Sequence, residues 1–340
     1  MWDLQRSRSP RDRLIALNRI ALDVMGGDNA PAETVAGAVL AVESGVDVLL
    51  VGDSTQIHEE LERAGADLPL LHAPDTIEMG EDVGRALREK PDSSVATCAR
   101  LTRDGEVAGF VSAGSTGAAM AAAALIIGRI PGVLRPTIAT IFPTIGSPTV
   151  VVDSGANPEV KPEHLVQFAA MGAVFSEVVL GVERPRVALL NIGEEPGKGR
   201  QLDKDTFVRL QASDLHFVGN VEGRALSKDE ADVIVTDGFT GNVFLKTVEG
   251  AAALLSILFL EALSTISPEA SAELIPRLEP IRHRMDYENT GGAHLLGVEG
   301  VVVIAHGSST RRSVSNALRL ASDGAERGLP DRVAARIAAP

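Results

Sequence analysis

Short apolar runs alternate with longer helical patterns along most of this chain. From residue 20 onward the apolar runs lie in seven segments: RIALDV, VDVLLVGD, GFVSAG, TVVVDSG, RVALLNIG, ADVIVTDG and GVVVIAHG. Runs that are apolar on both faces are typical of strands covered by helices on each side. Their alternation with helical patterns of 10–15 residues predicts an α/β fold built on a mostly parallel sheet.

Polar, glycine-rich segments follow six of these runs. They cover residues 23–31, 112–120, 153–164, 191–199, 237–246 and 306–313. The carboxyl ends of parallel strands meet at one edge of a sheet, where open α/β sheets bind their ligands. Loops that open helices offer backbone N–H groups and hydroxyls, which bind anions and phosphate above all. Any one loop could be an ordinary turn or helix cap, but six together predict a site for a small anion.

Several other classes of enzyme lack their fingerprints here. The sequence has no GxGxxG opening a βαβ unit and no GxxxxGK[ST], which disfavours dinucleotide and P-loop sites. It also has no GxSxG elbow and no HExxH, which disfavours hydrolases and zinc proteases.

The composition of the chain further narrows the functions that it can have. The 340 residues carry 32 basic and 46 acidic side chains, a net charge of −14, and only 3% are aromatic. Nucleic acid is therefore a poor partner. The one cysteine, Cys98, allows no intramolecular disulfide and is expected to be buried. Residues 1–18 lack the apolar core of a secretory signal and are expected to be a disordered extension. The apolar runs GAAMAAAALIIG and AAALLSILFL are shorter than the roughly 20 residues that span a bilayer. We expect a cytoplasmic protein.

The loops carry a resemblance to a known family. The relevant segments are DVMGGDNAP, REKPDSS, SAGSTGA, GRIPGVLRPTIATIFPT, GANPEVKPEHLVQFAAMG, LLNIGEEPGKG, GNVEGR, DGFTGNVFLKTVEG and YENTGGAHLLGVEGVVVIAHGSS. In this order they resemble the bacterial phosphate acyltransferases, which form acyl-phosphate from acyl carrier protein thioesters and inorganic phosphate. The likeness runs from about residue 19 to about residue 321. Two positions depart from the usual family residues: Ser115 stands where asparagine is usual, and His294 where a small residue or proline is.

The resemblance implies a three-layer α/β fold, similar to phosphotransacetylases and isocitrate dehydrogenases, with a protruding helical hairpin. It implies a single catalytic domain over 19–325, with the hairpin at 246–286 and a C-terminal tail at 326–340. It also implies a homodimer whose acyl donor is acyl carrier protein. The product would pass to a membrane glycerol-3-phosphate acyltransferase in phospholipid synthesis.

The reaction needs positioning and oxyanion stabilisation more than acid–base machinery, because phosphate is already nucleophilic and a thiolate leaves readily. Lys198 is the candidate catalytic cation, with a solvated surface lysine as the alternative. Asn242 could donate to an oxyanion or cap a helix. His306 could protonate the leaving thiolate or only bond a neighbouring loop.

Candidate residues for binding phosphate or substrate lie in the same loops. They are Asp23, Gly26, Gly27, Ser115, Thr116, Asn157, Lys161, His164, Thr240, Gly241, Ser308 and Ser309. The aspartates of these loops would repel phosphate if they were unpaired, so we expect them to orient donors or cap helices. No cofactor is expected, although a carboxylate-bound Mg²⁺ is an alternative.

The segment 246–286 is the most apolar part of the second half. Apolar residues surround the whole predicted helix at 248–266, which must therefore be buried by protein or meet lipid. Pro276 and Pro280 predict that a following helix is interrupted. A hairpin in the dimer interface and a hairpin tip that docks on the bilayer both fit. Arg277, Arg282 and Arg284, or Arg311 and Arg312, are candidates for docking an acidic carrier protein.

Two other functions remain open from the sequence. One is a phosphotransacetylase-like transfer that uses coenzyme A, and the other is a scaffold that recruits acyl carrier protein to the membrane without turnover.

Overall fold

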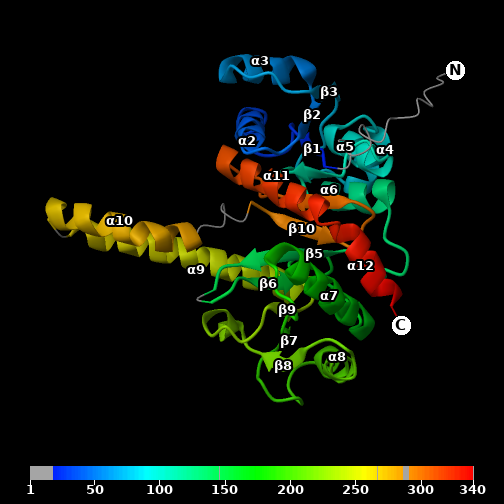
Figure 1. Cartoon of the computed structure of the whole chain (residues 1–340), viewed down its shortest axis with the longest axis vertical. Coiled ribbons are helices and arrows are strands. Elements are labelled where there is room, and N and C mark those ends of the chain that lie inside the picture. Colours follow the sequence, from blue (N-terminus) through cyan, green and yellow to red (C-terminus); the bar gives the residue numbers. More distant parts are fainter. Residues whose placement is uncertain (1–17, 145, 266, 286–290, 340) are drawn as a thin grey trace. The chain divides into compact units, whose positions relative to one another are not determined.

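The structure is a computed structural model that describes residues 18–144, 146–265, 267–285 and 291–339 (Figure 1). Its contacts divide the chain into two compact units. Unit 1 comprises Met1–Ile130 and Val298–Asp331, and unit 2 comprises Pro131–Gly297 and Arg332–Pro340. Of the expected extension at 1–18, only residue 18 lies within the described part of the chain. A single catalytic domain over 19–325 stays a prediction.

Unit 1 is built on parallel strands. Their order is β3 (Leu70–His72), β2 (Val48–Gly52), β1 (Ile20–Asp23), β4 (Gly109–Ser112) and β11 (Val301–Ile304). Its helices are α2 (Ala32–Glu43), α3 (Ser54–Ala64), α4 (Val83–Glu89), α5 (Ser94–Arg103), α6 (Thr116–Ala122) and α11 (Arg311–Glu326). A π-helical turn at Ala123–Ile127 extends α6. Helices α2 and α11 pack on the sheet through Val35, Val314 and Leu318, which join Leu22 and Val303 in one buried core.

Unit 2 is a mixed sheet. Its strand order is β10 (Ala293–Leu296), β5 (Thr137–Phe142), β6 (Thr149–Val152), β9 (Val233–Val235), β7 (Val187–Leu190) and β8 (Phe217–Val221). The β10–β5 and β5–β6 pairs are antiparallel, and the remaining pairs are parallel. Around them lie α7 (Pro162–Phe175) with its π-helical end Ser176–Leu180, α8 (Gln201–Gln211) and the 3₁₀ turn Gly223–Ser227. The expected tail at 326–340 contains α12 (Leu329–Ala338), in which Leu329 and Val333 are buried.

The predicted fold class is confirmed, because all seven apolar segments contain strands and most strand pairs are parallel. The six predicted loops follow β1, β4 and β11 in unit 1, and β6, β7 and β9 in unit 2. His294, which the sequence left uninterpreted, is buried on β10. Its ring packs edge-on against Phe175 with 5.0 Å between the ring centroids, so it is part of the core of unit 2.

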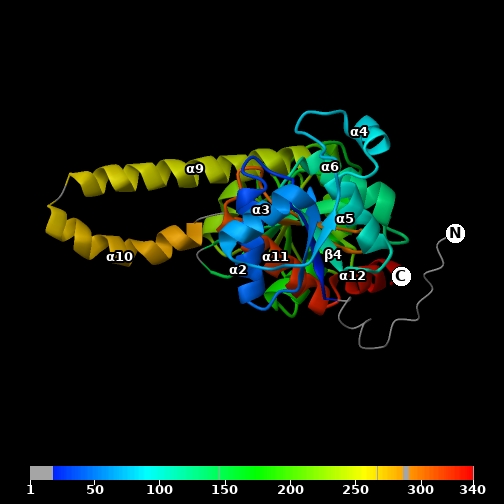
Figure 2. The ribbon, with the colours of Figure 1, turned by 90° about the horizontal axis from the view of Figure 1, so that it is seen from above.

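The apolar segment of unit 2 forms two long helices. α9 (Gly238–Ser264) and α10 (Pro268–Met285) run side by side (Figure 2), and the Ser271 hydroxyl donates to the Leu263 carbonyl at 2.8 Å. The predicted interruption was wrong, because α10 continues through Pro276 and Pro280. Each proline removes one backbone N–H donor from the interior of α10, and the helix continues without those two hydrogen bonds.

α9 keeps a large apolar surface in contact with solvent in the single chain. Its exposed residues are Leu254, Leu255, Ile257, Leu258, Phe259 and Leu260, of which Leu260 is 64% exposed. Among the described residues, two helices are long and apolar enough to cross a membrane by length and composition. The one at Pro162–Leu180 is mostly buried, whereas the apolar part of α9 contains no fully buried residue. We expected the apolar runs to be too short to span a bilayer because we counted only unbroken runs of apolar residues. The helix α9 extends beyond its run.

Candidate active site

The loops of unit 1 contact one another at the carboxyl ends of three adjacent strands. The Asp28 N–H after β1 donates to the Gly307 carbonyl after β11 at 2.8 Å. Gly26 lies so close to the loop after β4 that a Cβ there would be 2.7 Å from the Gly114 nitrogen. A Cβ on Gly27 would be 3.3 Å from the Gly307 oxygen. The predicted residues of these loops are therefore brought together within unit 1.

Asp23 ends β1 beneath these loops and is only 3% exposed. The Ser112 hydroxyl donates to Asp23 Oδ2 at 2.7 Å, and the Gly114 N–H donates to that hydroxyl at 3.1 Å. Burial raises the pKa of Asp23, against the effect of its hydrogen bonds. A carboxyl in this position links the end of β1 to the loop after β4, and its role in binding a ligand stays a prediction.

Hydroxyls at the helix starts of unit 1 differ in their availability. Ser115 caps α6 by accepting from the Ala118 N–H at 3.4 Å, and Thr116 beside it is exposed. Ser308 is exposed, and its hydroxyl lies 2.8 Å from His306 Nδ1. Ser309 is buried, with its hydroxyl 3.3 Å from that of Ser313. Ser308 and Thr116 are thus better placed than Ser309 to meet a ligand.

In unit 2, Asp153 organises the loop after β6. Its carboxylate accepts from the backbone N–H groups of Ile138, Gly155, Ala156 and Asn157. The Asn157 side-chain amide donates to Asp153 Oδ2 and to the Pro136 carbonyl, both at 2.8 Å. Asn157 was a candidate ligand, and its two amide hydrogens are already engaged in the loop.

The start of α9 packs directly on this loop. Asp237 is the N-cap of α9 and accepts from the Thr240 N–H at 2.8 Å and the Thr240 hydroxyl at 2.9 Å. A Cβ on Gly241 would lie 1.9 Å from the Asp153 carbonyl oxygen, so only glycine fits there. Asn242 is exposed, and its Oδ1 would be 3.6 Å from a Cβ on Gly155. Asp237 therefore caps α9, as one of the two roles expected of the loop aspartates, and the capping alternative for Asn242 was wrong because Asn242 lies inside the helix.

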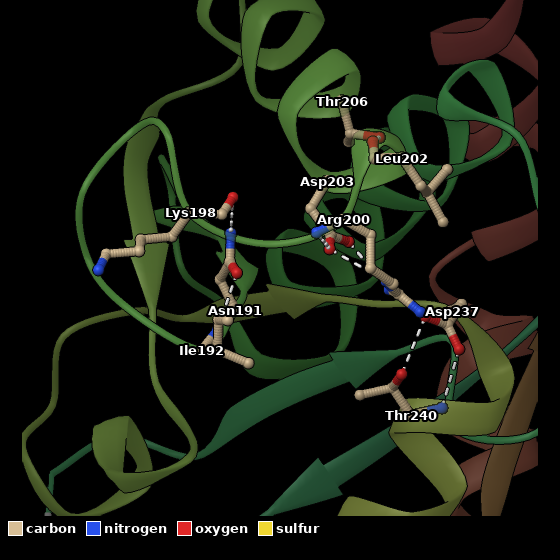
Figure 3. Close-up of polar contacts among 9 residues, drawn as sticks. All are labelled: Asn191, Ile192, Lys198, Arg200, Leu202, Asp203, Thr206, Asp237 and Thr240. Carbon is tan, nitrogen blue, oxygen red and sulfur yellow. Dashed lines mark hydrogen bonds and ion pairs between the residues drawn. The ribbon is translucent and has the colours of Figure 1, made fainter.

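Lys198 lies in the loop between β7 and α8, and its side chain is half exposed. Its ammonium is 3.9 Å from Glu195 Oε1, and its carbonyl accepts from the Asn191 side-chain amide at 3.2 Å. Figure 3 shows the ammonium on the side of the loop that faces away from Thr240. The side chain is therefore available to a ligand, and it would have to rotate to face α9.

Lys161 and His164 open α7. The Lys161 N–H donates to His164 Nδ1 at 3.1 Å, which requires that nitrogen to be unprotonated. Partial burial, followed by nearby Arg135, lowers the pKa of His164. The neutral imidazole is thus the form that caps the helix, while the Lys161 side chain is exposed.

The Mg²⁺ alternative gains no support from this geometry. Within the described ranges, no group of three or more histidine, cysteine, aspartate or glutamate side chains could hold a metal ion. The carboxylates of Asp153 and Asp237 already accept from several N–H donors. Whether the reaction uses a metal stays a prediction.

Sequence reasoning missed Arg200, Asp203 and Asn220 around the Lys198 loop. Arg200 forms ion pairs with Asp203 and Asp237 (Figure 3), and Asn220 on β8 donates to the Glu195 carbonyl at 2.9 Å. Asn220 lies inside the GNVEGR segment and Arg200 directly follows GEEPGKG, so position next to a motif was the available signal.

Comparison with known proteins defines the class. Residues 18–332 match the model of the family described as fatty acid synthesis protein. The phosphate acyltransferase of Desulfitobacterium hafniense (strain Y51) is 45% identical over 321 residues, which cover 93% of this chain and 96% of that protein. The phosphate acyltransferase of Thermus thermophilus is 47% identical over 324 residues, covering 94% and 99%.

The fold is also found in solved structures. A phosphotransacetylase from Streptococcus pyogenes superposes with a TM-score of 0.62 over 94% of this chain and 99% of its own, at 16% identity. This likeness shows that the two proteins share a fold. The chain belongs to the phosphate acyltransferase family. It is an enzyme of the acyltransferase class.

Proposed function

We propose that this enzyme transfers the acyl group of an acyl carrier protein thioester to inorganic phosphate, and that the acyl-phosphate feeds phospholipid synthesis. Membership of the phosphate acyltransferase family over residues 18–332 carries the proposal. The half-exposed Lys198 and the exposed Asn242 of unit 2 support it, as do the exposed hydroxyl-bearing residues Thr116 and Ser308 of unit 1.

The chemistry has three parts. A phosphate oxygen attacks the thioester carbonyl, the tetrahedral oxyanion collapses, and the carbon–sulfur bond breaks to release the carrier thiolate. We assign oxyanion stabilisation to Lys198 and Asn242, because fixed cations and amide donors are effective at developing negative charge. His306 is our candidate for the proton that the thiolate takes up. The remaining hydroxyls and glycine N–H groups of the loops would bind phosphate.

The decisive test mixes purified protein with phosphate and an acyl carrier protein thioester, and follows acyl-phosphate directly. Parallel reactions contain the matching acyl-coenzyme A, or omit phosphate. We expect product only when phosphate is present, with the carrier thioester as the better donor. Equal turnover with acyl-coenzyme A would favour the phosphotransacetylase-like alternative, whereas carrier binding without turnover would favour the scaffold.

Fewer of the candidate arginines are available to dock an acidic carrier protein than the sequence indicated. Arg277 pairs with Glu273 at 2.9 Å, and Arg311 donates through its Nε to Glu33 at 3.1 Å. The side chains of Arg282 and Arg284 lie outside the described residues. A salt titration of KM for the carrier thioester tests electrostatic docking, because exposed charge attraction weakens as salt rises.

We further propose that α9 and α10 serve the homodimer interface and meet the bilayer, so that product reaches a membrane acyltransferase without crossing water. The support is the exposed apolar surface of α9, since a helix that is apolar all round is buried by protein or contacts lipid. Peripheral contact would be reversible. Leu258→Glu with Phe259→Glu should abolish flotation with anionic liposomes while the protein remains dimeric. Loss of the dimer would assign α9 to the interface alone, and unchanged flotation would exclude docking through this helix.

A further inference from the structure

The loop that carries Lys198 and the helix that carries Asn242 are connected through one guanidinium group in unit 2. Arg200 lies two residues after Lys198, and it immediately precedes α8. Its Nε donates to Asp203 Oδ2 at 3.0 Å, and its Nη2 donates to Asp203 Oδ1 at 2.9 Å. The same Nη2 donates to Asp237 Oδ2 at 2.6 Å. Figure 3 shows the side chain extended between the two carboxylates.

Both carboxylates are nearly inaccessible to solvent. Asp203 is 5% exposed and Asp237 is 2% exposed. Each also orders a helix start: Asp203 Oδ2 accepts from the Arg200 N–H at 2.7 Å, and Asp237 accepts from Thr240. Burying a carboxylate costs free energy unless the group is paired with a cation. The position of Arg200 therefore restricts the positions of both carboxylates. Burial opposes ionisation of Asp237, but hydrogen bonds from Thr240 and Arg200 outweigh it and lower the pKa of Asp237.

The rest of the Lys198 loop is held at separate points. Asn191 donates to the Lys198 carbonyl at 3.2 Å, and Asn220 donates to the Glu195 carbonyl at 2.9 Å. Gly199 has a φ of +89°, and a Cβ there would be 2.6 Å from Asn191 Oδ1 and 2.7 Å from Asp203 Oδ2. The backbone between Lys198 and Arg200 therefore has little room to move independently of the ion-paired cluster.

We infer that Arg200 is a positioning residue that sets the Lys198 loop and the first turn of α9 in one fixed relative geometry. It acts through Asp203 and Asp237 and need not touch a substrate. The role requires an arginine, because a planar guanidinium can bond two carboxylates at once while a lysine ammonium is a single point charge. The consequence for turnover rests on the proposed function, whereas the consequence for loop order does not.

Arg186 provides a matched control in the same unit. It too bonds two aspartates: Nη2 lies 2.9 Å from both Asp229 Oδ1 and Asp232 Oδ1. Asp232 is buried like Asp237. Arg186 directly precedes β7, at the opposite end of that strand from Asn191 and the Lys198 loop. A substitution of Arg186 therefore disrupts a comparable cluster of ion pairs that lies outside the candidate site.

The experiment compares Arg200→Lys with Arg186→Lys by hydrogen exchange, thermal unfolding and steady-state kinetics in phosphate and acyl donor. We expect both variants to lose thermal stability. Only Arg200→Lys should speed exchange of the Thr240 and Gly241 amides and of residues 193–199. In the same variant kcat should fall about tenfold or more, with KM for phosphate nearly unchanged, because small misplacement of catalytic groups costs rate.

Three results would overturn the inference. Unchanged exchange at Thr240 and Gly241 in Arg200→Lys would show that the guanidinium does not order α9. Equal kinetic effects of the two substitutions would show a merely structural role. A large rise in KM for phosphate with kcat preserved would make Arg200 a direct phosphate ligand. A wild-type protein that makes no acyl-phosphate would instead refute the proposed function, and the exchange measurement would still decide the role of Arg200.

Asp237→Asn supplies a second route if Arg200→Lys does not fold. Asparagine can still cap α9, but it loses the charge that Arg200 bonds. If the inference is correct, the backbone amides of residues 193–199 exchange faster in this variant, because Asp237 acts on that loop through Arg200. Unchanged exchange there would count against it as firmly as the Arg200→Lys result.

Discussion

Asp23 in unit 1 and Asp153 in unit 2 occupy equivalent positions at the ends of strands but make different hydrogen bonds. Both are buried, and both stand at the carboxyl end of a parallel strand just before a predicted ligand loop. Asp153 accepts from four backbone N–H groups, whereas Asp23 is bonded through the Ser112 hydroxyl and carries a pKa raised by burial. Asp153 thus orders a loop through backbone donors, while burial raises the pKa of Asp23.

The same contrast extends over the two sets of loops. Unit 2 places charged groups in fixed pairs around the starts of α8 and α9, with Arg200 between Asp203 and Asp237. Unit 1 relies on hydroxyls and close backbone crossings, as at Ser115, Ser308 and Gly26. The two sets thus differ in kind, and single substitutions can probe each of them separately.

The largest effect is expected at Lys198. Lys198→Ala should lower kcat by about 10²–10³, the usual cost of removing a group that stabilises an oxyanion. The fold should survive, because the side chain is half exposed and its ion pair with Glu195 is 3.9 Å long. Steady-state rates of acyl-phosphate formation measure the loss. The control is Lys204→Ala, an exposed position on α8, and equal rates for the two variants would remove Lys198 from the mechanism.

The second prediction concerns stability in unit 2. Asp153→Asn removes a charge that several N–H groups donate to, and asparagine presents an NH₂ group to some of those donors. The free energy of unfolding should fall by about 3 kcal/mol, since hydrogen bonds to a charged group contribute about 1.5–3 kcal/mol each. Urea denaturation of the two proteins gives the difference. A change of less than about 0.5 kcal/mol, the size typical of a surface substitution, would mean that the loop is held by its glycines and by packing alone.

The sequence predicted the strands that are apolar on both faces and missed those that are not. β8 contains Gly219 and Asn220, β10 contains His294, and β5 places threonines between its apolar residues. Their positions depend on pairing with strands that are distant in the sequence, as β10 pairs with β5. Local periodicity could not reveal these pairings.

The residues of the candidate site could be predicted from the sequence to about the same extent as the strands. Motifs gave the loops, but the residue offered as a possible helix cap was Asn242, whereas the N-cap of α9 is Asp237. The ion pair between Arg200 and Asp237 joins residues 37 positions apart, so no local rule could find it. Conversely, Asn157 looked like a ligand from its place in a loop, and its amide hydrogens are engaged with Asp153 and Pro136.

The third prediction tests substrate binding by unit 1. Ser308 is exposed and its hydroxyl is within bonding distance of His306 Nδ1. Ser308→Ala should raise KM for phosphate about fivefold and change kcat less, as expected for one hydrogen bond worth about 1 kcal/mol. Initial rates over a range of phosphate concentrations give both constants. Ser44→Ala, at the exposed end of α2, is the control. A fall in kcat with an unchanged KM would instead place Ser308 in the chemical step, together with His306.

The smallest effect is expected for Asp23→Asn, and its sign depends on pH. A folded-state pKa raised above the unfolded value favours the protonated carboxyl, so wild-type stability is fully present below pH about 4 and is lost as pH rises through the folded pKa. Asparagine is neutral at every pH and can still accept from Ser112. The two proteins should therefore be nearly equal in stability at low pH, with the variant gaining on wild type as pH increases. Urea unfolding of both proteins from acidic to neutral pH measures that difference, and a variant that loses stability relative to wild type with rising pH would contradict the raised pKa of Asp23.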